Sequence, residues 1–425
     1  MVAAEPALSF PATLLLVQHY PDGGSMTGLL DLVRGLDRGR YRPVVTLRTP
    51  NPFVAELRDA GAEVVVLDDR LEIESEAAGA VRDPRPVARW GRRLAASPTR
   101  RELSRLIRRD IPHAWKLLRV VRQRGVDVIH ANNDVLSNRD ALIAGAVARV
   151  PTVVHTRWIH DYRKGPTLVV DRALARRAAH LVFMSQAIAD SCRALRIPPD
   201  RVSVLDDPFE PADYTAAPSR AVSRELGLPA GARVVVHVGR LVPWKGQDVF
   251  LRAMALVITH EPQAIALVVG GGEAGTHAGF PRQLEQLAHD LGIGDRVVFA
   301  GRRRDVAQML ALSDAVVHSS TEPEPFGRVV VEAMAAGRAV VGADAGGVPE
   351  IIDHGATGLL VAPNDPPRLA EAIGGLLADP SAARAMGERA REAVRDRFSL
   401  RAHARAMEAI YDRVRIGRPA RTRGR

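Results

Sequence analysis

Two glutamates, Glu324 and Glu332, stand eight residues apart in a stretch whose residue types suit a ligand with several hydroxyl groups. The stretch, Ser319–Glu350, reads SSTEPEPFGRVVVEAMAAGRAVVGADAGGVPE. We expect a helix from about residue 326 to residue 336, with apolar strands before and after it. Glu324 then lies in a loop, and Glu332 lies about two turns into the helix, at ~3.6 residues per turn. The two carboxylates can therefore face one ligand from two depths.

The start of this predicted helix suits a phosphate. The first N–H groups of a helix have no partner within the helix, and the helix dipole favours negative charge there. A glycine at this point lets a ligand approach the backbone. Hydroxyls for the carboxylates and phosphates for the amides together describe a nucleotide sugar. The residues at the helix start are Phe326, Gly327, Arg328 and Val329.

The run EPFGRVVVEAMAAGRAVV resembles the E-x7-E signature of retaining glycosyltransferases of family 4, which have the GT-B fold. The resemblance implies that Glu324 binds hydroxyls of the donor sugar and Glu332 binds the ribose. It also implies that Phe326, Gly327, Arg328 and Val329 belong to the donor site. The alternative is an ordinary strand, loop and helix of an α/β domain, with both glutamates as solvated surface charges.

Two cations lie on one short loop in the segment ARVVVHVGRLVPWKGQD, residues 232–248. Arg240 and Lys245 would neutralise the charge that builds on a leaving diphosphate. The sequence has only three lysines against 56 arginines, so a lysine here is less expected by chance. GRLVPWKG is similar to the G-R-L-x-x-x-K-G motif of the family, in which the Arg and Lys bind the donor diphosphate. The alternative is a solvated loop.

A strand, a glycine turn and a helix open the chain, at residues 12–20, 21–25 and 26–36. Such an opening cradles phosphate in many α/β proteins. The resemblance to family 4 assigns Gly23 and Gly24 to the donor site.

Polar side chains follow the predicted strand that ends in VDVIHANND. Ligands of parallel sheets bind at the carboxyl ends of the strands. Asn132, Asn133 and Asp134 therefore either line the acceptor site or cap the following helix.

The next strand and loop, PTVVHTRWIHDY, depart from the family pattern. Family 4 enzymes often carry a histidine near the sugar, which we expect at position 157, where this chain has Arg157. Strand geometry places His155 on the same face as Arg157. We infer that His155, Arg157 or His160 takes the place of that histidine. An arginine would stabilise the diphosphate or an anionic acceptor, but it stays charged and is no base.

The length of 425 residues predicts two domains. The repeated strand–helix rhythm predicts parallel sheets. The resemblance to family 4 implies that this α/β protein has the GT-B fold, with two Rossmann-like domains facing each other across a cleft. The predicted parts are an acceptor domain at 1–207, a donor domain at 208–399, a helix at 400–415 returning to the first domain, and a basic disordered tail at 416–425.

The formal net charge of +10 is concentrated in one region. Residues 82–124 contain fourteen Lys/Arg and three Asp/Glu, and the rest of the chain sums to −1. Three interpretations remain: solvated helix faces, a surface for anionic membrane lipids, and nucleic-acid binding. The last lacks an aromatic platform or motif, so we expect no nucleic-acid partner.

The resemblance to family 4, taken with these features, implies a retaining, metal-independent glycosyltransferase that uses a nucleoside-diphosphate sugar, with UDP or GDP favoured and no further cofactor. The acceptor is expected to be a glycan, a lipid-linked compound or a small molecule. One cysteine and no apolar run long enough for a signal or membrane span predict a cytoplasmic protein, with the inner membrane face as a peripheral location. The alternatives are another GT-B sugar-nucleotide enzyme, such as an epimerase or phosphorylase, and a non-catalytic subunit of a glycan assembly complex.

Overall fold

The computed structural model describes residues 11–20, 24–67, 104–160, 168–272 and 277–416. The chain divides into two compact units. Unit 1 holds the described residues up to Pro208 together with those from Leu400 onward, and unit 2 is Phe209–Ser399. The first boundary lies one residue beyond the predicted position 207. Gly23, residues 82–103 of the basic region and the tail from residue 417 lie outside the described residues.

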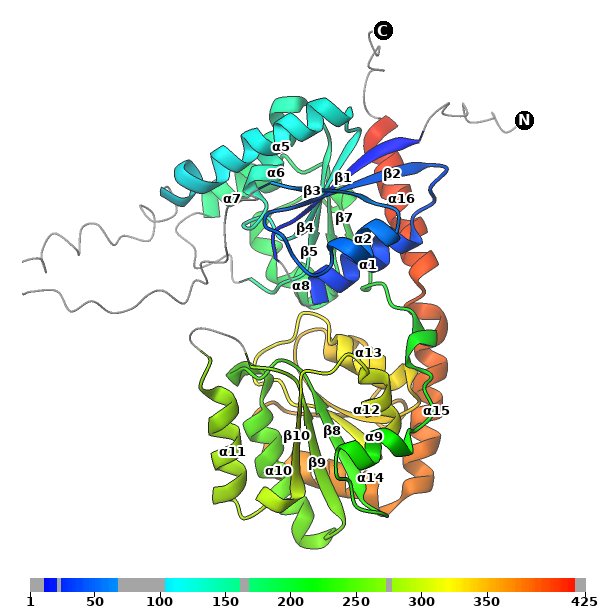
Figure 1. Cartoon of the computed structure of the whole chain (residues 1–425). Coiled ribbons are helices and arrows are strands. Elements are labelled where there is room, and N and C mark those ends of the chain that lie inside the picture. The colour runs from blue at the N-terminus through cyan, green and yellow to red at the C-terminus, as the bar shows by residue number, and fades with distance from the viewer. Residues whose placement is uncertain (1–10, 21–23, 68–103, 161–167, 273–276, 417–425) are drawn as a thin grey trace, which may run out of the picture. The chain divides into compact units, whose positions relative to one another are not determined.

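Unit 1 is built on a seven-stranded parallel sheet with the order β3-β2-β1-β4-β5-β6-β7 (Figure 1). Its strands are nearly continuous apolar runs, as expected for a sheet covered on both faces. All seven residues of β1 are buried, for example. The strands are β1 (Ala12–Gln18), β2 (Tyr41–Leu47), β3 (Glu63–Val66), β4 (Val128–Asn133), β5 (Thr152–Thr156), β6 (His180–Phe183) and β7 (Val202–Val204).

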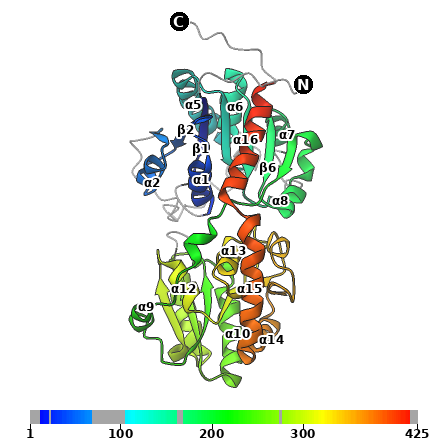
Figure 2. The same cartoon turned by 90° about the vertical axis from the view of Figure 1, so that its right-hand side faces the viewer.

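The last helix of the chain, α16 (Leu400–Ile416), returns to unit 1 and packs against α1 (Gly24–Gly35) and β4 (Figure 2). The Tyr411 hydroxyl lies 2.8 Å from His130 Nδ1, and Glu408 accepts a 2.7 Å hydrogen bond from the backbone N–H of Asp37. The remaining helices of unit 1 are α2 (Val54–Asp59), α5 (Ile111–Arg124), α6 (Arg139–Ala148), α7 (Leu168–Ala175) and α8 (Gln186–Ser191).

Unit 2 repeats this plan with a six-stranded parallel sheet of order β10-β9-β8-β11-β12-β13. Helices α10, α11 and α14 place their apolar residues in one core cluster with alternate residues of the central strands. The strands are β8 (Arg233–Val238), β9 (Ala264–Val269), β10 (Val297–Gly301), β11 (Ala315–His318), β12 (Ala339–Ala343) and β13 (Leu359–Val361). The helices are α9 (Arg220–Glu225), α10 (Gln247–His260), α11 (Phe280–Asp290), α12 (Val306–Leu312), α13 (Arg328–Ala335), α14 (Pro366–Ala378) and α15 (Pro380–Arg397).

Each sheet has a point where the strand order reverses direction. In unit 1 it falls between β1 and β4, and in unit 2 between β8 and β11. Ligands of open parallel sheets bind beyond the carboxyl ends of the strands at such a point. The loops that follow β8 and β11 are therefore where unit 2 is expected to bind its ligand.

Candidate functional site

The reversal point of the unit 2 sheet brings Lys245 and Glu324 together. Lys245 lies in the short helical turn Pro243–Lys245 after β8, and Glu324 lies in the loop after β11. Lys245 Nζ is 2.6 Å from Glu324 Oε2. The two side chains are 15% and 12% exposed, so the pair is largely shielded and still reachable by a ligand. Two motifs found separately in the sequence thus form one site.

Two further side chains hold the same carboxylate oxygen. Ser320 Oγ donates a 3.0 Å hydrogen bond to Glu324 Oε2, and His318 Nε2 lies 3.3 Å from it. Among the described residues, all side-chain bonds to Glu324 end on Oε2, which leaves Oε1 for a ligand. Sequence reasoning missed His318 and Ser320. Both residues could have been found, because they are polar and stand at the carboxyl end of a predicted parallel strand.

The environment keeps Glu324 ionised. Burial alone favours the neutral acid, but the Lys245 ammonium and the bond to His318 outweigh it and hold the pKa of Glu324 far below its usual range. A carboxylate of this kind accepts hydrogen bonds from hydroxyl groups and has no proton to donate at neutral pH. Glu324 is therefore suited to binding sugar hydroxyls and not to general-acid catalysis.

The loop that carries Lys245 is fixed from several sides. Lys245 Nζ lies 4.2 Å from the centroid of the Trp244 ring, and the Arg240 guanidinium carbon lies 5.9 Å from the same ring. The backbone oxygen of Trp244 accepts a 2.8 Å hydrogen bond from the N–H of Thr321, and that of Arg240 accepts one from the buried Gln247 side chain. Arg240 and Lys245 thus flank one aromatic ring on an anchored loop, which suits a diphosphate.

Gly246 lets the two loops approach. Its φ is +69°, and a Cβ at this position would lie 1.9 Å from the backbone oxygen of Ser319. No side chain fits there. This glycine therefore sets the distance between the Lys245 loop and the segment that leads to Glu324.

Helix α13 begins at Arg328, one or two residues later than predicted, because Gly327 has a φ of +103° and precedes the helix. Phe326 is 2% exposed and packs edge-on against Phe398 at 5.7 Å. Phe326 therefore anchors this turn, and the first amides of the helix come from Arg328 and Val329.

Glu332 is held by different residues from those around Glu324. Its Oε1 accepts a 2.9 Å hydrogen bond from the Tyr214 hydroxyl and lies 3.2 Å from Arg328 Nε. The Tyr214 ring stacks on Phe209 at 5.0 Å. The ribose-binding role of Glu332 remains a prediction. No motif pointed to Tyr214, which lies 118 residues earlier in the chain.

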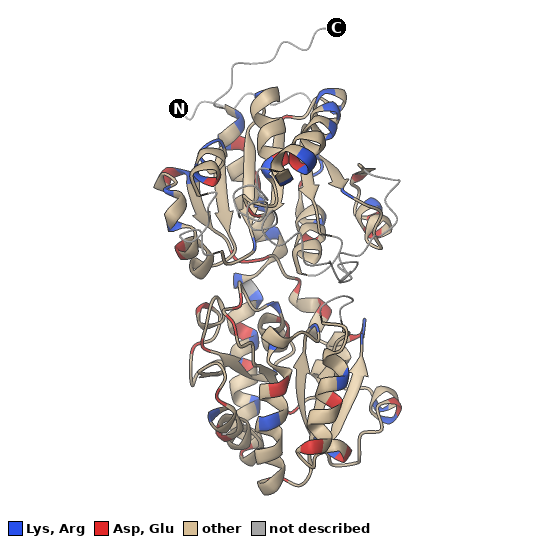
Figure 3. Cartoon of the chain, turned by 90° about the vertical axis from the view of Figure 1, so that its left-hand side faces the viewer, with Lys and Arg blue, Asp and Glu red and all other residues tan. Residues whose placement is uncertain are grey.

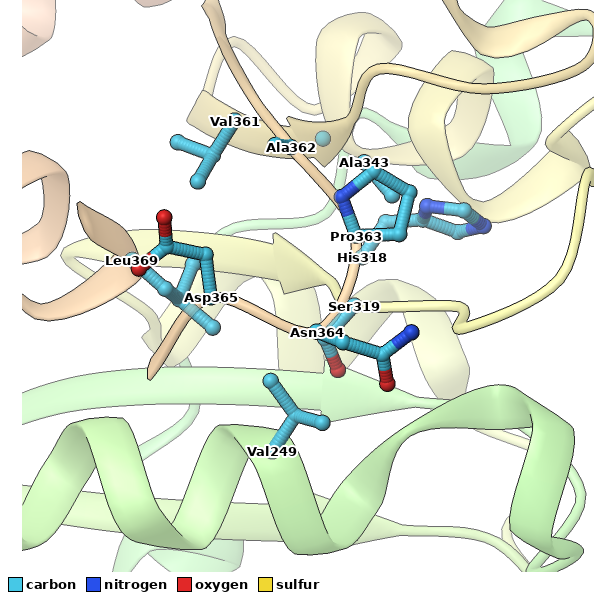
Figure 4. A pocket seen from close by; sticks show the side chains of 11 residues that line it. Val249, His318, Ser319, Ala343, Val361, Ala362, Pro363, Asn364, Asp365 and Leu369 are labelled. Atoms are coloured by element: carbon cyan, nitrogen blue, oxygen red, sulfur yellow. The ribbon is translucent and has the colours of Figure 1, made fainter. Parts of the chain in front are cut away.

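A small hollow lies behind this site, at the carboxyl ends of β11 and β12 (Figure 4). His318 and Ser319 line it together with Ala343, Asn364 and Asp365. Its volume is about 10 Å³, roughly what one water molecule needs. It is therefore too small for a sugar or a nucleotide.

In unit 1, the reversal point between β1 and β4 holds a buried polar network. Asn132 donates hydrogen bonds to Gln18 Oε1 at 2.6 Å and to the backbone oxygen of Ser25 at 3.0 Å. Its Oδ1 accepts a 2.7 Å bond from Arg157 Nε. Arg157 also forms a buried ion pair with Asp207. Asn132 and Arg157 are thus bonded within unit 1, and this leaves them less free for a ligand than expected.

Asn133 and Asp134 differ from Asn132. Asn133 has a φ of +112°, uncommon for a residue other than glycine, and its buried Nδ2 has no hydrogen-bond partner among the residues that the structure describes. Asp134 accepts bonds from the N–H and hydroxyl of Ser137 and lies 3.4 Å from His160 Nε2. Asp134 therefore stabilises the turn before α6, whose N-cap residue is Asn138. The predicted acceptor role of all three residues stays a prediction.

His155 is a core residue of unit 1. It is completely buried on β5, between the rings of His130 at 5.5 Å and His403 of α16 at 5.8 Å. Burial and the neighbouring Arg157 charge keep its pKa well below the usual value, so it stays neutral. Of the three residues proposed for the family histidine, only His160 keeps a partly exposed side chain, at 25%. Gly24, the described member of the glycine pair, begins α1.

This burial predicts a pH dependence of stability. His155 stays neutral in the fold but binds a proton near pH 6.5 when unfolded, so it destabilises the protein progressively below that pH. We expect His155→Phe to reduce the loss in free energy of unfolding between pH 7 and pH 5 by about 2 kcal/mol relative to wild type. Urea titrations followed by circular dichroism would measure it. His260→Gln, at an exposed position, should leave the loss unchanged, and equal losses in wild type and His155→Phe would contradict the assignment.

Two parallel-sheet Rossmann-like units, with cations and a carboxylate at the reversal point of the second sheet, define a protein of the GT-B class. Residues 219–393 match the family model described as glycosyl transferases group 1, and residues 23–207 match the glycosyl transferase 4-like domain. The matches cover 175 and 185 residues, together 360 of the 425. Both halves of the chain thus match glycosyltransferase domains, the second of them that of group 1, and the predicted α/β fold of two Rossmann-like domains is confirmed.

The chain is also similar to individual glycosyltransferases of known name or structure. D-inositol 3-phosphate glycosyltransferase of Corynebacterium kroppenstedtii is 38% identical over 226 residues, which are 52% of this chain and 50% of that protein. N-acetyl-alpha-D-glucosaminyl L-malate synthase of Bacillus anthracis is 28% identical over 71% of this chain and 78% of its own length. The crystal structure of HepE from Anabaena in complex with UDP and glucose is 27% identical, with a TM-score of 0.77, and covers 94% of this chain and 99% of HepE.

The chain spans about half the length of the inositol-phosphate relatives that it matches. Within the described residues, no helix combines the length and the apolar character that crossing a membrane requires.

Proposed function

We propose that this protein is a retaining, metal-independent glycosyltransferase that moves a sugar from a nucleoside-diphosphate sugar to a hydroxyl group of an acceptor. The observation that carries the proposal is the Lys245–Glu324 pair at the reversal point of the unit 2 sheet, 2.6 Å apart. A cation for the diphosphate and an ionised carboxylate for the sugar hydroxyls stand side by side there. HepE, which has the same fold, binds UDP and glucose in its crystal structure, and this favours UDP over GDP as the nucleotide.

In this proposal, separate residues bind the diphosphate, the sugar and the ribose of the donor. Arg240 and Lys245 neutralise the diphosphate, with the amides around Gly327 as further contacts in unit 2. The free Oε1 of Glu324 accepts bonds from sugar hydroxyls. Glu332 takes the ribose hydroxyls, for which it must share its carboxylate with Tyr214 and Arg328. The cationic side chains thus bind the negative diphosphate, and the carboxylates bind hydroxyl groups that donate hydrogen bonds.

In the reaction, the bond between the sugar carbon and the diphosphate oxygen breaks, and the acceptor oxygen forms the new bond on the same face. The acceptor proton passes to the leaving diphosphate. Negative charge builds on that diphosphate, and the cations of the Trp244 loop stabilise it more in the transition state than in the substrate. Because the leaving group takes the proton, the mechanism does not need a side-chain base, which agrees with the neutral, buried His155 and the always charged Arg157.

The acceptor is proposed to bind at the carboxyl edge of the unit 1 sheet. The Nδ2 of Asn133, which lacks a partner within the described part of the chain, and its strained backbone are the features that favour this place. Two relatives are named for D-inositol 3-phosphate and L-malate, hydroxyl compounds that carry negative charge. Glycan, lipid-linked and small-molecule acceptors all fit the proposal, with a cytoplasmic location at or near the inner membrane face.

Nucleotide binding tests the proposal without knowledge of the acceptor. We expect UDP at saturating concentration to raise the melting temperature of the wild type, because a ligand that binds only the folded state stabilises it by mass action. Lys245→Ala should lose most of this shift, since it removes a cation from the diphosphate. Differential scanning fluorimetry with UDP, GDP, ADP and their sugars measures it.

Lys116→Ala is the matched control, because it removes the other described lysine, in α5 of unit 1. It should keep the full shift. A UDP shift that survives in Lys245→Ala would remove Lys245 from the donor site, and no shift with any nucleotide would count against the proposed function.

A further inference from the structure

One helix of unit 1 exposes large apolar side chains. Ile107, Ile111 and Trp115 are 55%, 38% and 62% exposed and follow each other at intervals of four residues, in the turns 104–110 and the start of α5. Side chains at this spacing lie on neighbouring turns of one helical face. We call this surface the Trp115 face.

The Trp115 face is not the side that holds the helix in the fold. Ala114, Leu117, Leu118 and Val121 of the same helix are buried in unit 1. A helix that covers a sheet normally presents polar residues on its outer side. Here a second apolar surface remains after the core is complete.

Basic residues frame the Trp115 face. Arg108, Arg119 and Arg122 are exposed, and residues 104–124 contain seven Lys/Arg against one acid, Asp110. Asp110 is 6% exposed and lies near Arg109 and Arg139. By contrast, acidic and basic residues are interspersed over the helices of unit 2 (Figure 3). The outer side of this helix therefore carries positive and apolar groups without exposed negative ones.

We infer that the Trp115 face docks on the surface of an anionic lipid bilayer. Trp115, Ile111 and Ile107 would enter the boundary between headgroups and acyl chains, and the three arginines would lie at the lipid phosphates. Charge complementarity selects this occupant, because a second copy of the chain would bring the same positive charge to the contact. Only the purpose of this docking rests on the proposed function: it would bring the enzyme to an acceptor at the membrane.

Vesicle binding tests the inference on the full chain. Wild type should co-sediment at least about tenfold more strongly with vesicles of phosphatidylcholine and phosphatidylglycerol than with phosphatidylcholine alone, and salt should weaken the binding. Trp fluorescence should shift to the blue on binding, and Trp115→Phe should remove most of that shift. Replacing Arg108, Arg119 and Arg122 by glutamine should weaken binding about 100-fold, from about fivefold per arginine.

A matched triple variant separates local from general charge effects. Arg252, Arg401 and Arg405 are exposed arginines on α10 and α16, and their replacement by glutamine should leave vesicle binding within about threefold of wild type. Ile111→Ser with Trp115→Ser should abolish binding while circular dichroism and the UDP shift stay unchanged. That unchanged UDP shift keeps a failure here distinct from a failure of the proposed function.

Three outcomes would overturn the inference. Vesicle binding that ignores lipid charge and salt would exclude the arginines, and equal losses in both triple variants would exclude this face. A concentration-dependent dimer that disappears in the Ile111→Ser/Trp115→Ser variant, measured by analytical ultracentrifugation, would make a second copy the occupant.

Discussion

Replacing Glu324 by glutamine should lower the rate of UDP release from the accepted nucleotide sugar by about 10²–10³-fold, the usual cost of removing one well-placed polar group from the transition state. The amide keeps the size of the side chain but loses its charge. A neutral oxygen accepts hydrogen bonds from the sugar about half as strongly as a carboxylate. Lys245, 2.6 Å away, also loses its ionic partner. Steady-state kinetics with the nucleotide sugar that stabilises the wild type would measure the loss.

Glu322→Gln is the matched control, because Glu322 is exposed and lies two residues earlier in the same loop. It should keep activity within about threefold of wild type, the range of an ordinary surface substitution. Circular dichroism must show that Glu324→Gln is folded. A folded Glu324→Gln protein with activity as high as that of Glu322→Gln would show that Glu324 does not contact the donor.

Most strands and motifs of unit 2 could be predicted from the sequence, because there the apolar periodicity and the motifs agree. The apolar strand predicted before the helix of the two glutamates is β11, Ala315–His318, and the one predicted after it is β12, Ala339–Ala343. Each motif was visible alone. That Lys245 and Glu324, 79 residues apart, touch each other follows from β8 and β11 being neighbours. Strand order is a property of the whole sheet, and local spacing does not encode it.

Unit 1 shows why some site residues could not be judged from the sequence. His155 stands at the carboxyl end of a parallel strand, where a functional side chain is expected. The helix that covers it, α16, comes almost 250 residues later and places His403 against its ring. Arg157 is likewise taken up by Asp207, 50 residues away. Both outcomes depend on long-range packing, which a strand-and-loop pattern does not specify.

The role of a glycine in a turn could not be judged from the sequence either. Gly227 and Gly246 both follow a helical segment, and both have positive φ, +65° and +69°. At Gly227 an added Cβ would meet nothing within 4 Å, whereas at Gly246 it would lie 1.9 Å from the Ser319 oxygen. The sequence indicates a turn at both positions. Only the structure shows that the turn at Gly246 also sets the distance between the Lys245 loop and the segment around Ser319.

This difference predicts a large and selective effect of Gly246→Ala. Gly227→Ala should cost about 1 kcal/mol in free energy of unfolding, from positive φ alone. Gly246→Ala should cost about 3–5 kcal/mol, because the methyl group also meets a backbone oxygen that no rotamer change can move. Urea unfolding of both variants, at the same pH and salt, would measure the difference.

The same substitution should also weaken nucleotide binding. The clash is relieved only if the Lys245 loop moves away from the segment around Ser319, and that movement separates Lys245 from Glu324. We therefore expect Gly246→Ala to lose most of the UDP-induced thermal shift, while Gly227→Ala keeps it. Equal stability losses in the two variants would mean that the loops part without cost. A full UDP shift in Gly246→Ala would mean that their distance does not control donor binding.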